Sequence, residues 1–204
     1  MAGADRDHIE EVLRFWFGSL GPDGTVDKAH RARWFAASDE VDRRCREAFE
    51  TDLVRAVRGE LDDWPATPRG QLALIVLLDQ LSRNIYRGTA RAFAQDAKAL
   101  AVCQDGLARG ADHALHYIER VFFYMPLQHA EGRDAQRRSV ECFEGLVAEV
   151  SPLQRPLFED FLNYARRHRA VIERFGRFPH RNAILGRPST SAELAFLADA
   201  GAPF

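Results

Sequence analysis

The 204-residue sequence predicts an all-α protein of about eight or nine helices. Apolar residues recur at helical spacing along most of the chain, and no alternating run is long enough for a strand. Residues that favour helix starts and stops stand at regular intervals between these runs. The connections are short, so neighbouring helices are expected to form antiparallel hairpins, in a tetratricopeptide-like stack or a bundle.

Four helices are predicted in the first half of the chain. The first begins at a capping box of Asp7 and Glu10 and ends before Gly18. A short second helix bears Trp34. The next two are placed at residues 39–58, between Ser38 and Gly59, and at residues 68–87, between Thr67-Pro68 and Gly88.

Five helices are predicted in the second half. They cover residues 93–109, closed by Gly110; 113–124, ended by Met125-Pro126; 133–150; 152–175, begun by Ser151-Pro152 and ended by Gly176; and a short helix after the capping box of Thr190 and Glu193. Between the last two helices, residues 177–188 form the longest irregular segment late in the chain.

Length and composition indicate one globular domain spanning residues 1–204. Apolar residues make up 46% and charged residues 28% of the chain, as in ordinary globular proteins. The net charge of -2 provides no general attraction to nucleic acid, and no basic stripe occurs. We therefore expect no nucleic-acid partner.

The distribution of cysteines and apolar runs predicts a cytoplasmic protein. Cys45, Cys103 and Cys142 are odd in number and far apart, so they suit buried thiols in a reducing compartment better than disulfides. The N-terminus lacks the basic-then-apolar order of a signal peptide. No apolar run approaches the length that spans a membrane, so no membrane partner is expected.

Three polar clusters adjoin apolar segments, and the first follows the continuous apolar run Leu72–Leu78. A helix that is apolar all round is normally central in its domain, so its polar continuation should start from within the fold. Gln80, Arg83 and Asn84 are candidate ligand-binding residues there, because a buried guanidinium and buried amides need partners. The alternative is structural: Asp79 and Arg83 pair along the helix.

The second cluster lies in FFYMPLQHAEGRD, where His129 and Glu131 follow a proline. A histidine beside a carboxylate suits a general base with the group that orients it, so both are candidate catalytic residues. Two alternatives are a pair of metal ligands and a structural pair in which Glu131 favours a helix N-terminus. No motif such as HExxH is present, and we expect neither metal nor cofactor.

The third cluster is the segment GRFPHRN, residues 176–182. Arg177, His180, Arg181 and Asn182 crowd a loop stiffened by proline, and such fixed donors suit a carboxylate or phosphate. The alternative is that these side chains donate to the unpaired carbonyls at the end of the preceding helix.

The same motifs resemble one protein family. LDQLSRNIYRG, MPLQHAE and GRFPHRNAILGRPSTSAELAFL, together with VLRFWFG and RWF, resemble the bacterial family catalogued as domain of unknown function 924, from about Val12 to Leu197. The resemblance implies an all-α, tetratricopeptide-like fold and no particular reaction. It places nine residues in the recurrent polar motifs: Gln80, Arg83, Asn84, His129, Glu131, Arg177, His180, Arg181 and Asn182.

Two functions and one structural role are compatible with these residues. In the favoured interpretation the clusters form one pocket for a small anionic molecule, which Arg83, Arg177 and Arg181 hold. His129 moves a proton there and Glu131 orients it, so the site suits binding and catalysis alike. The alternative function is a tetratricopeptide-like scaffold that binds a peptide segment. A third interpretation makes the polar residues a buried network that fixes helix packing.

Overall fold

The computed structural model describes residues 3–35 and 38–199, and within these ranges all regular structure is helical. The all-α prediction is confirmed. In order, the elements are α1 (Gly3–Phe17), α2 (Lys28–Phe35), α3 (Asp39–Val57), η1 (Trp64–Ala66), α4 (Pro68–Ile75), η2 (Val76–Leu81), α5 (Ser82–Ile85), η3 (Ala90–Phe93), α6 (Asp96–Ala108), η4 (Ala111–Ala114), α7 (Tyr117–His129), α8 (Arg133–Glu149), α9 (Arg155–Phe175), η5 (Pro179–Arg181) and α10 (Ser191–Ala198). A tetratricopeptide-like arrangement stays a prediction.

The described residues separate into two compact units. Unit 1 takes its residues from 1–87 and 91–126, and unit 2 from 88–90 and 127–204. The division along the main chain falls inside α7, immediately after Pro126. The expectation of a single domain over residues 1–204 stays a prediction.

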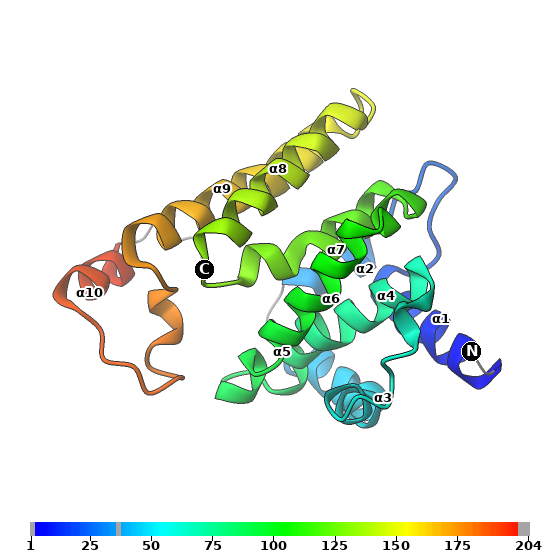
Figure 1. The fold of residues 1–204 in the computed structure, drawn as a ribbon, viewed down its shortest axis with the longest axis horizontal. Coiled ribbons are helices and arrows are strands. Elements are labelled where there is room, and N and C mark those ends of the chain that lie inside the picture. The colour runs from blue at the N-terminus through cyan, green and yellow to red at the C-terminus, as the bar shows by residue number, and fades with distance from the viewer. Residues whose placement is uncertain (1–2, 36–37, 200–204) are drawn as a thin grey trace. The chain divides into compact units, whose positions relative to one another are not determined.

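The centre of unit 1 is one continuous helix made of α4, η2 and α5. It packs against α1, α3 and α6 (Figure 1). Residues 72–78 are at most 1% exposed, in agreement with the apolar run that marks them as central. Its start is also as predicted, since Thr67 accepts a hydrogen bond from the Gly70 amide and Pro68 occupies the first turn.

A π-helical segment, η2, interrupts this helix and was not predicted. In a π-helix each amide bonds five residues back instead of four, which widens the turn. The segment contains two buried polar residues, Asp79 and Gln80. Gln80 Nε2 donates to Asp79 Oδ2 at 2.5 Å and lies 3.2 Å from Met125 Sδ. The wide turn therefore coincides with the first polar cluster of the sequence.

The predicted end of a helix at Pro126 is wrong, because α7 continues through the proline to His129. A proline removes one backbone hydrogen bond, but here it lies near the last turn, where a side chain supplies other bonds. Gln136 Nε2, from α8, donates to the carbonyls of Gln128 at 2.6 Å and Ala130 at 2.8 Å. This contact with the next helix stabilises a helix end that local sequence alone does not.

Four predicted starts also differ from the structure. α1 begins at Gly3 instead of Asp7, and α6, α7 and α9 begin at Asp96, Tyr117 and Arg155 instead of 93, 113 and 152. The residues immediately before α6 and α7 include the 3-10 turns η3 and η4. Before α9, the Gln154 amide donates to Ser151 O in a turn, and a second proline, Pro156, occupies the first turn instead of Pro152.

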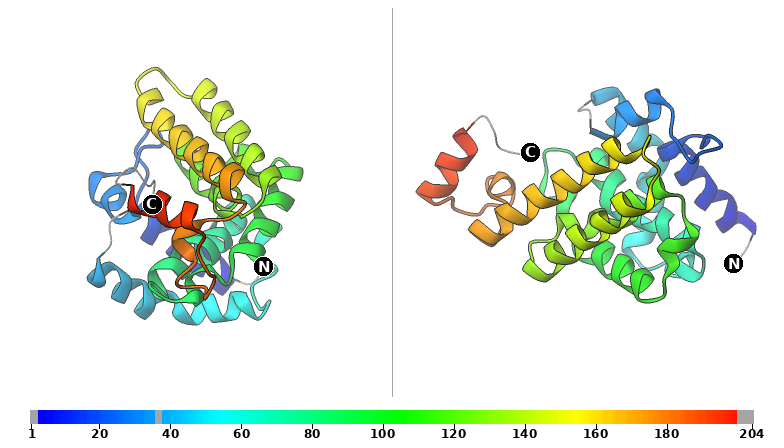
Figure 2. Two further views of the ribbon diagram at one scale, coloured as in Figure 1. Left: turned by 90° about the vertical axis from the view of Figure 1, so that its left-hand side faces the viewer. Right: turned by 90° about the horizontal axis from the view of Figure 1, so that it is seen from above.

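Unit 2 is built on the hairpin of α8 and α9, which lie side by side (Figures 1 and 2). α9 ends as predicted at Gly176, whose φ of 70° suits a residue without a side chain. After this turn Phe178 returns to the helix and packs in a core with Val171 and Ile172. The packed phenylalanine fixes the start of the irregular segment that contains the third polar cluster.

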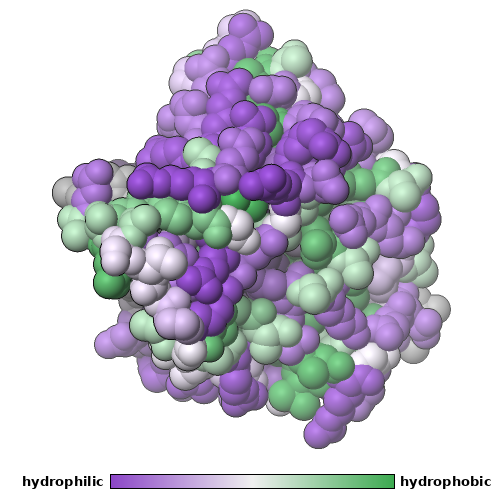
Figure 3. All heavy atoms as spheres, turned by 60° about the vertical axis from the view of Figure 1, so that its left-hand side comes forward, coloured by the Kyte–Doolittle hydropathy of each residue, from purple (hydrophilic) through white to green (hydrophobic). Residues whose placement is uncertain are grey.

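The surface contains no single continuous apolar face in the view of Figure 3, where hydrophobic residues form separate patches among hydrophilic ones. The exposed large hydrophobic side chains are spread along the described chain: Val57, Leu153, Tyr164, Ile184, Leu194 and Leu197. Among the helices of residues 3–35 and 38–199, none combines the length and apolar character needed to cross a membrane.

Candidate functional site

The nine predicted site residues are divided between the two units. Gln80, Arg83 and Asn84 belong to unit 1, and the other six belong to unit 2: His129, Glu131, Arg177, His180, Arg181 and Asn182. The second and third clusters of the sequence are therefore in one unit. That the first cluster shares a site with them stays a prediction.

In unit 1, Arg83 is held by its own surroundings. Its Nη2 atom lies 3.4 Å from Asp79 Oδ1 and 3.0 Å from Asp96 Oδ1, and Nη1 donates to Ala92 O at 3.3 Å. The guanidinium also lies over the Phe93 ring, 5.3 Å from its centroid. The contact with Asp79 is the structural alternative considered from the sequence. These interactions tie α5 to η2, η3 and α6.

Asn84 takes part in a second structural contact of unit 1. Its Nδ2 atom donates to Asp42 Oδ1 at 2.8 Å, and Arg87 donates to both oxygens of the same carboxylate. Burial by itself raises the pKa of Asp42, but the hydrogen bonds from Arg87 and Asn84 outweigh it and hold the pKa below its usual value. The ionised carboxylate thus joins α3 to the end of α5.

In unit 2, three histidines and an arginine gather near one phenylalanine. The ring centroid of Phe178 is 5.5 Å from that of His168 and 5.7 Å from that of His180. The guanidinium carbon of Arg181 lies 4.7 Å from the Phe178 centroid, and the His129 ring is 6.2 Å from the His168 ring. We call His129, His168, His180 and Arg181 the His–Arg cluster.

Separate elements position the His–Arg cluster. His129 is the last residue of α7, His168 lies on α9, and η5 contributes His180 and Arg181. Arg181 is buried and its Nη2 donates to the His129 carbonyl at 3.1 Å. The sequence alternative placed such a contact at the end of α9, but Arg181 makes it at the end of α7. The bond fixes η5 against the C-terminal turn of α7.

Glu131 is bound within the loop that follows. Its carboxylate accepts from the Phe178 amide at 2.7 Å and from Arg187 Nη1 and Nη2 at 2.6 and 2.9 Å. Burial raises its pKa, but these bonds outweigh it, so the pKa lies below its usual value. Arg187 Nε also donates to Asn182 Oδ1 at 3.0 Å. Glu131 and Asn182 therefore hold the shape of the loop beside the His–Arg cluster.

Arg177 binds the last helix instead of lying in the cluster contacts described above. Its Nε and Nη2 atoms donate to the two oxygens of Glu193 at 2.7 and 2.9 Å, and Nη2 also donates to Pro188 O at 2.8 Å. The Arg177 hydrogen bond, followed by that of the Thr190 amide, lowers the pKa of Glu193 to about 2. This pair connects the loop to α10.

Two residues of this region were missed by sequence reasoning, His168 and Arg187. His168 interrupts the apolar stripe of α9, lying three residues after Ala165 and four before Ile172. A histidine at a core position of an amphipathic helix was the readable signal. Arg187 gave a weaker signal, because nothing local indicates that it reaches Glu131, 56 residues away.

His168 is a neutral histidine with a defined tautomer. Its Nδ1 atom lies 2.8 Å from the Tyr164 carbonyl, which can only accept, so Nδ1 carries the proton and Nε2 is an acceptor. Burial, together with the charges of His129, His180 and Arg181, lowers the pKa of His168 to about 3. The imidazole therefore contributes an acceptor, and not a charge, at neutral pH.

This pKa predicts a loss of stability in mild acid. Below the ordinary value of 6.5, the unfolded chain binds a proton at His168, whereas the folded chain does not until the pH falls to about 3. The free energy of unfolding should fall by about 2 kcal/mol between pH 7 and pH 5 from this group alone. Urea unfolding at several pH values measures it, and His168→Gln should remove this part of the slope. The exposed His113→Gln is the control; equal slopes in wild type and His168→Gln would contradict the expectation.

Other chemistry is less well supplied in the described residues. In residues 3–35 and 38–199, no group of three His, Cys, Asp or Glu side chains is placed to hold a metal ion. Cys45 is buried, and burial, followed by the charge of Asp42, raises its pKa to about 11. A thiol with so high a pKa is a poor nucleophile at neutral pH.

Comparison with known proteins gives one family and one solved structure. The model of the family described as "Bacterial protein of unknown function (DUF924)" matches residues 12–201. The chain is similar to the protein of unknown function ATU0120 from Agrobacterium tumefaciens, with 35% identity and a TM-score of 0.80 over 96% of this chain and 99% of that one. Comparison with curated proteins gives no match.

Proposed function

Because the chain belongs to DUF924, a family of bacterial proteins of unknown function, its site is the guide to its activity, and we propose that the His–Arg cluster binds a small molecule through a carboxylate or phosphate group. The observation that supports this most directly is the gathering of three imidazoles and one guanidinium near Phe178. Charged nitrogen donors on a fixed loop are the groups with which proteins hold such anions.

The electrostatics of the cluster support an anion over a cation. The pKa of His168 is lowered first by burial and then by the nearby positive charges of His129, His180 and Arg181. The nearby carboxylate, Glu131, is bound by Arg187 and the Phe178 amide, which turns its charge to the loop. An anionic ligand would reduce the mutual repulsion of the cluster.

The cluster also suits proton transfer at the bound molecule. His129 is half-buried, at the end of a helix, and imidazole is the side chain most often used as a general base at neutral pH. We retain His129 as the group that moves a proton. The contacts of Glu131 support a role in holding the loop that carries His180 and Arg181; its role in orienting His129 stays a prediction.

Titration of the full chain with inorganic phosphate and with acetate tests the proposal. We expect saturable binding, followed by the ring protons of the histidines in NMR spectra. His180→Gln should weaken it by about ten-fold or more, since one charge-assisted donor is lost. His180 is partly exposed, so this variant is expected to fold.

The matched control is His113→Gln, which removes an exposed imidazole in η4 of unit 1. It should leave both affinities unchanged. Arg181→Met serves as a second variant and should abolish binding. The proposal is wrong if neither anion gives a saturable response, or if His113→Gln weakens binding as much as His180→Gln does.

A further inference from the structure

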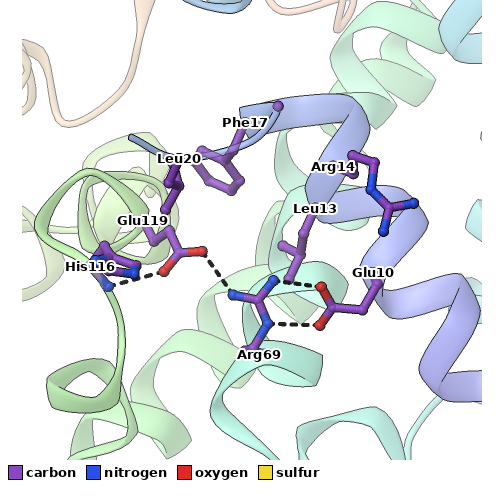
Figure 4. Close-up of a pocket in the computed structure, with 9 residues that line it drawn as sticks. Glu10, Leu13, Arg14, Phe17, Leu20, Arg69, His116 and Glu119 are labelled. Atoms are coloured by element: carbon purple, nitrogen blue, oxygen red, sulfur yellow. Dashed lines mark hydrogen bonds and ion pairs between the residues drawn. The ribbon is translucent and has the colours of Figure 1, made fainter. Parts of the chain in front are cut away.

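Unit 1 contains a pocket that none of the three polar clusters contributes to. It has a volume of about 250 Å³ and lies among α1, α4 and the start of α7 (Figure 4). Typical sites for drug-sized ligands begin at about 300 Å³, so this pocket suits a smaller molecule. Its lining is Glu10, Leu13, Arg14, Phe17, Gly18, Leu20, Arg69, His116 and Glu119.

Arg69 stands between two carboxylates of this pocket. Its Nε and Nη2 atoms each lie 2.7 Å from an oxygen of Glu10, and Nη1 lies 3.1 Å from Glu119 Oε1 (Figure 4). Glu119 is only 2% exposed and its other oxygen accepts from the His116 amide at 3.0 Å. The hydrogen bond from Arg69 lowers the pKa of Glu10 against the effect of burial. This side of the pocket is rich in fixed acceptors.

Arg14 adds a second positive charge to the lining. It extends from α1 near Glu10 and is exposed (Figure 4). No hydrogen bond or ion pair is recorded for its guanidinium among the residues that the structure describes. Its charge acts on Glu10 through space and also lowers the pKa of that carboxyl. All five of its N–H donors can therefore serve a ligand.

The formal charges of the lining cancel, and this decides the class of ligand. Arg14 and Arg69 are balanced by Glu10 and Glu119, so neither a simple anion nor a simple cation is favoured overall. A molecule with both charges close together can satisfy both kinds of group. Leu13, Phe17 and Leu20 supply an apolar surface beside them (Figure 4).

We propose that this pocket binds a free α-amino acid with an apolar side chain. Arg14 holds the α-carboxylate, Glu10 and Glu119 accept hydrogen bonds from the ammonium group, and the side chain lies against Phe17 and Leu20. The site is distinct from the His–Arg cluster and uses residues of unit 1 alone, so it stands or falls independently of anion binding there.

Calorimetric titration of the full chain with leucine tests this proposal. Leucinamide lacks the carboxylate and 4-methylpentanoate lacks the ammonium group, but both keep the apolar side chain. We expect leucine to bind with a dissociation constant in the millimolar range or below, and each analogue to bind at least about ten-fold more weakly. The three ligands thus separate recognition of both charges from recognition of either one.

Arg14→Gln should weaken leucine binding by about ten-fold or more, because the carboxylate loses a charge-assisted partner. Arg6→Gln is the matched control: it removes the same charge from the same helix at an exposed position outside the lining. It should change the dissociation constant less than about two-fold. Glu10→Gln should weaken leucine but leave 4-methylpentanoate unaffected.

Three results would each overturn the proposal. One is no saturable heat with leucine at about 10 mM. Another is equal binding of leucine and both analogues, which would mean that only the apolar surface matters. The third is an equal effect of Arg6→Gln and Arg14→Gln.

Discussion

Replacing Gly70 by alanine is expected to lower the free energy of unfolding of unit 1 by about 3 kcal/mol or more. A Cβ atom on Gly70 would lie 2.1 Å from the carbonyl oxygen of Trp64 and 2.9 Å from its carbonyl carbon. Both are backbone atoms of η1, which cannot move aside as a flexible side chain can. Trp64 itself is only 1% exposed, so displacing η1 also disturbs the core.

Gly145→Ala is the control for this substitution. Gly145 lies inside α8, and an added Cβ would meet nothing within 4 Å. Alanine should stabilise that helix by up to about 1 kcal/mol, because glycine loses more backbone freedom on folding. Urea unfolding of both variants by circular dichroism measures the changes. Similar small shifts in the two variants would show that η1 yields to the methyl group.

The predictions that hold are those in which the signal and its partner are close in sequence. Thr67 accepts from an amide three residues later, and Thr190 and Glu193 form their capping box within one turn. The left-handed glycine Gly176 likewise depends only on the end of its own helix. Such local contacts determine where these helices begin and end, and the all-α class follows from them.

The predictions that fail depend on contacts between distant residues. The continuation of α7 past Pro126 uses the side chain of Gln136 on the next helix. The π-helical turn η2 lies where a fully buried carboxylate, Asp79, meets Arg83 and Gln80. Neither feature has a periodic signal in the residues themselves, because the apolar run around it suits an α-helix equally well.

The candidate site was predictable by residue type and much less by partner. The loop after α9 was found from its crowded donors, but its arginines could not be assigned. Arg177 meets Glu193 on α10, and Glu131 meets Arg187 across 56 residues. A sequence indicates that a buried charge needs a partner. Which carboxylate supplies it is decided by tertiary packing.

Arg83→Met is expected to lower the free energy of unfolding by about 3 kcal/mol. The substitution keeps the length of the side chain but removes the cation that lies 3.4 Å from Asp79 and 3.0 Å from Asp96. Asp79 is fully buried, so its charge loses a partner where water cannot replace it. Chemical unfolding of the purified chain gives the change.

Arg43→Met is the matched control, because Arg43 also pairs with two carboxylates in unit 1, those of Glu40 and Glu47. All three side chains are more than half exposed, so the loss should not exceed about 0.5 kcal/mol. Near-normal stability of Arg83→Met would contradict the structural role. If anion binding to the full chain were lost at the same time, Arg83 would belong to the binding site, as its motif first indicated.

A second substitution distinguishes loss of an ion pair from loss of packing. If Arg83→Met destabilises because Asp79 keeps an incompletely balanced charge, then Asp79→Asn in the same chain should restore part of the stability, by about 1 kcal/mol. If the loss comes from the contact with Phe93, the second change should cost further stability instead. The sign of this coupling therefore decides whether the polar end of the central helix is held by charge or by packing.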